Sequence, residues 1–162
     1  MIRFNIYPFL SILLMFLMSC CNNQSGVNQL EQYFAYGDSI ESAGVKMIPI
    51  HTPYGDFRVW TKRFGTNPDV KVLLLHGGPA MTHEYMECFE TFFQRQGFEL
   101  YEYDQLGSFY SDQPENDSLW TIQRFVDEVD QVRQAIGADS NNFYLIGNSW
   151  GGLLAMEYAL KH

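Results

Sequence analysis

The feature that most constrains the fold of this chain is the alternation of short apolar segments with segments that carry helical signals. Residues 70–75 are almost continuously apolar and stop at a glycine cluster, as a strand buried on both faces does. The segments 98–103 and 143–146 are also strand-like. Apolar residues at three- and four-residue steps over 122–136, with Gly137 just after them, predict an amphipathic helix.

Two further helices, over residues 84–95 and 153–161, and an initial hairpin complete this pattern. Residues 46–50 and 56–63 are rich in β-branched and aromatic side chains, and turn-forming residues at 52–55 separate them. The order of hairpin, strand, helix, strand, helix, strand, helix predicts an α/β protein whose mostly parallel sheet has helices on both faces. In such sheets the chemistry lies at the carboxyl ends of the strands.

The pentapeptide Gly147-Asn148-Ser149-Trp150-Gly151 matches G-x-S-x-G and lies between a predicted strand and a predicted helix. A sharp turn there strains the backbone of Ser149, and glycines at both ends let strand and helix approach closely. The Ser149 hydroxyl would then point out of the sheet at the positive end of the helix, where negative charge is favoured. The same pattern also occurs in ordinary glycine-rich turns, so its position is what favours a nucleophile.

A second glycine motif, His76-Gly77-Gly78-Pro79, follows the first apolar strand. Because Gly78 has no side chain, its backbone N–H can reach a substrate oxygen. Together with the N–H of Trp150 it would stabilise a tetrahedral oxyanion. The alternative is that these glycines only form a tight turn at a strand end.

Three segments taken together resemble the prolyl aminopeptidase (proline iminopeptidase) branch of the α/β-hydrolase serine peptidases. The resemblance runs from about residue 48 to residue 162. The segments are HGGPAMTHEY at 76–85, DQLGSFYSDQP at 104–114 and GNSWGG at 147–152.

This resemblance implies that Ser149 is the nucleophile, that Gly78 and Trp150 donate to the oxyanion, and that the loop beginning at Asp104 forms a rigid wall. It implies release of an N-terminal residue, often proline, from a peptide with a free N-terminus through an acyl-enzyme. The resemblance gives structural roles to the other motif residues, which are His76, Gly77, Gly147 and Gly151. Two positions depart from the family pattern, because Ala80 and Phe109 stand where the family usually has glycine. We expect Ala80 to stiffen the oxyanion loop, and Phe109 with Tyr110 to narrow the substrate pocket.

None of the four histidines is expected to act as general base for Ser149. His76 and His83 are expected to hold loops, and His51 lies in the hairpin turn. His162 is on the helix that starts at Ser149 and cannot reach back to it. In this fold the triad acid and histidine follow the serine, and the family resemblance implies a helical cap as well. We therefore expect the chain to be the amino-terminal part of an α/β-hydrolase fold, without the cap and the later strands, and to be an inactive fragment by itself.

Other functions remain open at this point. The same motifs suit a related esterase or amidase, or a non-catalytic hydrolase-like surface lipoprotein. No cofactor is expected, and no His, Cys, Asp or Glu cluster has metal-ligand spacing. A formal charge of −9, from 10 basic and 19 acidic residues, argues against nucleic acid as a partner.

The N-terminus has the features of an export signal. Arg3 precedes an apolar run at 8–18, which is too short for a confident membrane span. The sequence Leu17-Met18-Ser19-Cys20 resembles the bacterial lipoprotein cleavage box, which implies lipidation of Cys20 and a membrane-anchored protein of the cell envelope, facing the periplasm or the exterior. We thus divide the chain into a signal peptide (1–19), a tether and lead-in (20–44) and a partial hydrolase domain (45–162). An ordinary signal peptide or a retained anchor helix is the alternative.

Overall fold

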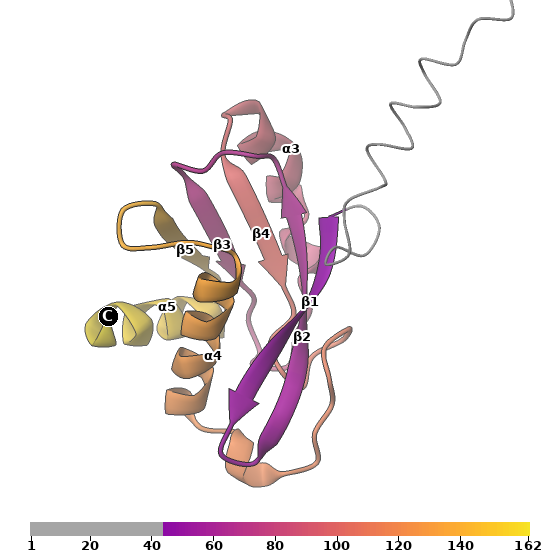
Figure 1. Cartoon of the computed structure of the whole chain (residues 1–162). Coiled ribbons are helices and arrows are strands. Elements are labelled where there is room, and N and C mark those ends of the chain that lie inside the picture. Colours follow the sequence, from indigo (N-terminus) through magenta and orange to yellow (C-terminus); the bar gives the residue numbers. More distant parts are fainter. Residues whose placement is uncertain (1–43) are drawn as a thin grey trace, which may run out of the picture. The chain divides into compact units, whose positions relative to one another are not determined.

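The computed structural model describes residues 44–162, which build a five-stranded sheet with helices on both faces (Figure 1). The predicted signal peptide, Cys20 and the tether lie outside the described residues, so they stay predictions. No helix within residues 44–162 is long and apolar enough to cross a membrane.

The predicted hairpin is confirmed. β1 (Val45–Thr52) pairs antiparallel along its whole length with residues 55–62 of β2 (Gly55–Phe64). The Thr52 hydroxyl closes the turn by donating to the carbonyl oxygen of Gly55 at 2.8 Å. The hairpin joins the sheet through the antiparallel pairing of β2 with β4.

The three strands predicted after the hairpin are also confirmed, as β3 (Lys71–Leu75), β4 (Glu99–Tyr103) and β5 (Phe143–Gly147). The strand order is β1-β2-β4-β3-β5, and β3 pairs in parallel with both β4 and β5. The sheet is therefore parallel where helices connect its strands and antiparallel where the hairpin joins it. Parallel strands end at the same edge, so the loops after β3, β4 and β5 lie together.

Successive side chains of a strand point to opposite faces of the sheet, so the core has two parts, one on each face. On one face Leu73, Leu75 and Tyr103 pack with α4 (Ile122–Ala135) and α5 (Trp150–Lys161), which lie side by side in Figure 1. On the other face Val72, Leu74 and Leu100 pack with Phe93 of α3 (Cys88–Arg95). The expectation of helices on both faces is thus correct.

Two helices differ from their predicted bounds. The segment 84–95 is divided into a 3-10 turn, η2 (Glu84–Met86), and α3. The turn follows His83, whose backbone and ring both bind the carboxylate of Asp104, a tertiary contact that no local pattern reveals. The last helix, α5, starts at Trp150 rather than at 153, because the two glycines at its start do not interrupt it. A 3-10 turn over Asp117–Leu119, η3, was not predicted.

Candidate active site

Ser149 forms the turn between β5 and α5, and its backbone is strained. Its φ is 53° and its ψ is −117°. Among the non-glycine residues that the structure describes, Phe109 is the one other case with positive φ. A side chain in such a conformation costs on the order of 1 to 3 kcal/mol and persists where the surroundings enforce it. Ser149 is exposed, so an external molecule can reach it.

The glycines on either side of Ser149 enforce this turn through contacts that leave no room for a methyl group. A Cβ on Gly147 would lie 2.2 Å from the carbonyl oxygen of Gly151. A Cβ on Gly151 would lie 1.9 Å from the carbonyl oxygen of Leu75, at the end of β3. The turn, the start of α5 and the end of β3 therefore meet backbone against backbone.

The loop after β3, residues 76–83, contains Gly77 and Gly78 and is called the glycine loop below. It lies directly beside Ser149. A Cβ on Gly77 would be 3.3 Å from the Cβ of Ser149. Gly78 has φ 117°, and a Cβ there would lie 2.3 Å from the backbone nitrogen of Ala80. Trp150 is the first residue of α5, where backbone amides have no acceptor within the helix. The structure thus brings Ser149 together with the segments of both expected oxyanion donors.

Gln105, which follows β4, binds both of these segments and is fully buried. Its backbone N–H donates to His76 Nε2 at 2.9 Å, and its side-chain Nε2 donates to the His76 carbonyl oxygen at 2.9 Å. Its Oε1 accepts from the indole Nε1 of Trp150 at 2.9 Å. With His76 Nε2 accepting, the proton lies on Nδ1, which donates to the carbonyl oxygen of Gly77. Burial lowers the pKa of His76 and so favours this neutral ring.

Asp104 fixes the next contact between the same loops. This buried carboxylate accepts from the backbone N–H and from Nδ1 of His83, both at 2.9 Å. The His83 ring stacks on Trp60, with centroids 4.2 Å apart. Burial alone would lower the pKa of His83, but the hydrogen bond and charge of Asp104 outweigh it and raise that pKa. Asp104 and His83 thereby tie the loop after β4 to the glycine loop.

The Ser149 hydroxyl has no hydrogen bond to a histidine or a carboxylate within residues 44–162. His76 and His83 are engaged as described above. His51 is exposed and pairs with Asp56, and the His162 ring stacks on Tyr158. No group of three His, Cys, Asp or Glu side chains in the described part of the chain is arranged to hold a metal ion.

A small apolar pocket of about 150 Å³ lies against the glycine loop. Ala80, one of the two departures from the family pattern, is among the residues that line it. Phe109 and Tyr110 do not line it; they pack against each other and beside His83. The pocket is lined by Pro79, Ala80, Leu106, Gly107, Trp120 and Phe125.

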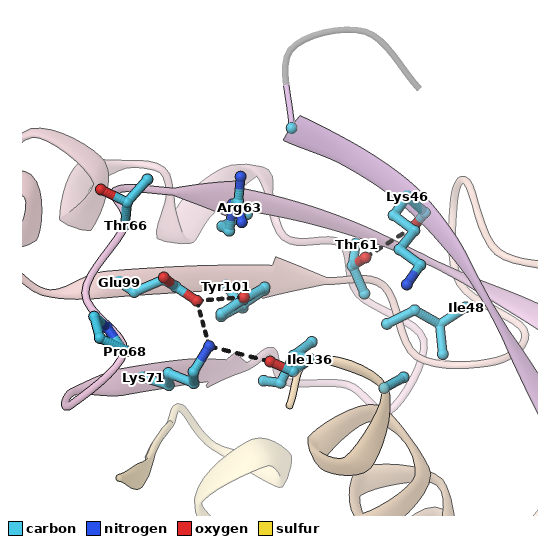
Figure 2. A pocket seen from close by; sticks show the side chains of 12 residues that line it. Lys46, Ile48, Thr61, Arg63, Thr66, Pro68, Lys71, Glu99, Tyr101 and Ile136 are labelled. Carbon is cyan, nitrogen blue, oxygen red and sulfur yellow. Dashed lines mark hydrogen bonds and ion pairs between the residues drawn. The ribbon is translucent and has the colours of Figure 1, made fainter. Parts of the chain in front are cut away.

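A cavity of about 390 Å³ lies at the opposite end of the sheet (Figure 2). Lys71, which begins β3, donates there to Glu99 at 2.7 Å and to the carbonyl oxygen of Ile136 at 3.1 Å. The Tyr101 hydroxyl donates to the same Glu99 carboxylate. Ser149 follows the other end of β5, which runs parallel to β3. This cavity is therefore separate from the Ser149 site.

Sequence reasoning missed two residues of the site, Gln105 and Tyr85. The Tyr85 hydroxyl accepts from the backbone N–H of Gly77 at 2.6 Å. Both residues occur in the segments that carry the family resemblance, which is the signal that could have found them. Single polar residues in loops show no periodicity, so pattern analysis passes over them.

The chain is similar in sequence to known proteins. The family model described as alpha/beta hydrolase fold matches residues 71–162. The chain is 80% identical over 116 residues to the proline iminopeptidase of Flavobacterium johnsoniae, and 79% identical over 116 residues to that of Elizabethkingia meningoseptica. Each match covers 72% of this chain and 39% of the relative, so the chain spans about two fifths of the length of these curated relatives.

The fold of the chain is also similar to that of a solved structure. The proline iminopeptidase of Mycobacterium smegmatis superposes with a TM-score of 0.63 at 30% sequence identity. That match covers 73% of this chain and 40% of the other.

Proposed function

The chain belongs to the alpha/beta hydrolase fold family, and from this we propose that it carries the nucleophile and the oxyanion donors of a serine aminopeptidase. The substrate is a peptide with a free N-terminus, and the released residue is proline or a related residue. The observation that carries the proposal is the strained, exposed Ser149 beside the Gly77-Gly78 loop. The similarity to proteins named proline iminopeptidase supports the choice of substrate.

The proposed reaction proceeds through an acyl-enzyme. The Ser149 Oγ attacks the carbonyl carbon of the N-terminal residue while its proton passes to a general base, and the backbone N–H groups of Gly78 and Trp150 stabilise the oxyanion. The C–N bond then breaks and the amine leaves with a proton from the protonated base. Water hydrolyses the ester and frees Ser149.

The proposal concerns the product of the complete gene, because in this fold the acid and the histidine of the triad follow the serine. Residues 44–162 supply the nucleophile, the donors and the loops that hold them. Without a base, a serine hydroxyl is a weak nucleophile. We propose that the 162-residue chain alone has at most a very small fraction of the full rate.

The test is labelling with a fluorophosphonate, followed by hydrolysis of a proline anilide and of an aryl ester. We expect the product of the complete gene to be labelled and to cleave the anilide, and Ser149→Ala to lose both activities. Ser140→Ala, in an exposed loop, is the matched control and should keep both. Faster cleavage of the ester, with no anilide hydrolysis, would identify an esterase instead. A folded protein that takes no label would be a non-catalytic scaffold, and the proposal would be wrong.

We also propose that Cys20 is lipidated and anchors the protein in the bacterial cell envelope. The support is the apolar run at 8–18, which ends in Leu17-Met18-Ser19-Cys20. Burial of acyl chains at about 0.8 kcal/mol per CH₂ is enough to hold a protein at a membrane. Cells fed an alkyne-tagged fatty acid should incorporate it into the protein, and Cys20→Ser should abolish the incorporation. Cys21→Ser is the matched control, and equal loss in both variants would contradict the assignment to Cys20.

A further inference from the structure

Gln105 lies in the site but has no role in the reaction proposed above. The two oxyanion donors belong to different parts of the chain, Gly78 after β3 and Trp150 at the start of α5. Their separation and direction decide whether both N–H groups can bind one oxygen, and preorganisation of this kind supplies most of the effect of such donors. Gln105 is bonded to both segments and comes from a third, the loop after β4.

The hydrogen bonds of Gln105 fix its orientation without ambiguity. An indole N–H only donates, so Trp150 Nε1 requires the amide oxygen of Gln105. A carbonyl oxygen only accepts, so His76 requires the amide nitrogen. Both ends of the side chain are thus assigned by their partners. The side chain of Gln105 is fully buried, which strengthens its hydrogen bonds.

One of these bonds acts on the backbone next to the Gly78 donor, and the other acts on the side chain of the residue that carries the second donor. Gln105 holds the oxygen of the His76–Gly77 peptide, and the Tyr85 hydroxyl holds the nitrogen of the same peptide. The next peptide along the chain carries the N–H of Gly78. The amide oxygen of Gln105 holds the indole of Trp150. The Trp150 ring also packs edge to face with Phe125, with ring centroids 5.2 Å apart.

We propose that Gln105 is a positioning residue that sets the distance and direction of the two oxyanion donors relative to each other. It does not touch the substrate, and the inference rests on the proposed function. Because the oxyanion exists only in the transition state, a displaced donor lowers kcat and leaves KM nearly unchanged. Complete loss of one donor lowers kcat by about 100- to 1000-fold. For Gln105→Leu, which leaves both donors in the chain but unbraced, we expect a loss of about 10- to 100-fold.

The experiment measures kcat and KM for a proline anilide in the product of the complete gene, normalised to the fraction of serine that fluorophosphonate labels. Normalisation removes any loss through misfolding. Gln105→Leu should lower kcat, and the binding of a prolyl aldehyde, which forms a tetrahedral adduct, should weaken by the same factor. Gln131→Ala is the control and should change neither, because the side chain of Gln131 binds the backbone of His51 in the hairpin.

Two further variants separate positioning from a general structural role. Trp150→Phe removes the indole N–H but keeps the backbone donor, and it should lower kcat to a similar extent. The double variant Gln105→Leu/Trp150→Phe should show less than the product of the two single losses, because both remove the same bond. In NMR spectra the indole N–H signal of Trp150 should move in Gln105→Leu, whether or not the protein is active.

The outcomes distinguish this inference from the proposed function. Unchanged kcat in Gln105→Leu, a change in KM alone, or fully multiplicative losses in the double variant would overturn the positioning role while Ser149 remains the nucleophile. Absence of labelling in the unmodified protein would overturn the proposed function instead.

Discussion

At the scale of single residues, the site depends on places where a methyl group does not fit. Gly151 lies against the carbonyl oxygen of Leu75, and the same contact brings the start of α5 to the end of β3. Gly152, the next residue, has only ordinary contacts, the nearest at 3.6 Å to the carbonyl oxygen of Gly147. Of these two adjacent glycines, Gly151 has no room for a Cβ, whereas Gly152 does.

This difference gives a prediction with an internal control. Gly151→Ala should lower the free energy of unfolding by more than about 2 kcal/mol, since the backbone around it cannot move aside. Gly152→Ala should be neutral or stabilise by up to about 1 kcal/mol, because alanine is the better helix former. Urea unfolding of both variants measures the two values. Equal effects would show that the close approach of α5 to β3 does not constrain residue 151.

Residues of the site were predictable to the extent that they belong to a pattern. The glycines and Ser149 form a motif whose spacing follows from a tight turn, and the structure has that turn where the motif predicts it. Gln105 and the contact of His83 with Asp104 depend on which loops meet in space. Such contacts are set by the order of strands in the sheet, which the sequence shows only indirectly.

At the scale of elements, the strands were the most predictable part. β3, β4 and β5 each coincide with a predicted strand to within one residue. β3 is the clearest case, because burial on both faces leaves little choice of side chain. The start of α5 was less predictable, since Gly151 and Gly152 are poor helix formers in isolation. There, packing against β3 overrides local preference.

The clearest amphipathic helix, α4, allows a test of its own N-terminus. The Thr121 hydroxyl accepts from the backbone N–H of Arg124 at 3.3 Å, which satisfies one of the free amides of the first turn. Thr121→Ala should cost about 1 kcal/mol of stability, and Thr121→Ser should keep most of it. Thermal unfolding of the two variants measures the difference. A serine variant as unstable as the alanine variant would mean that the hydroxyl does not act as a cap.

At the scale of the whole molecule, one buried carboxyl group bears on the response to pH. Glu102, in β4, is fully buried, and neither of its carboxylate oxygens has a hydrogen-bond partner within residues 44–162. Burial first, and then the charge of Glu90, raises the pKa of Glu102 to about 7. The charges of His83 and Lys62 act in the opposite direction, while Glu87 adds to the rise.

A carboxyl group with a raised pKa holds a proton that the unfolded chain releases, so stability falls as the pH increases from about 4.5 to about 7. Glu102→Gln removes this effect. We expect the variant to match the unmodified protein near pH 4.5 and to be more stable above pH 7, by on the order of 3 kcal/mol at most. Denaturant unfolding at several pH values tests this, with the exposed Glu115→Gln as control. A constant difference at all pH values would show that Glu102 does not titrate in this range.

The unusual backbone of Ser149 has a consequence for what kind of residue can be favoured there. A glycine would adopt φ 53° and ψ −117° with less strain, so folding by itself favours the loss of this side chain. The hydroxymethyl group of Ser149 is therefore present at a cost in folding stability. Its role has to lie in a contact with a molecule from outside the protein.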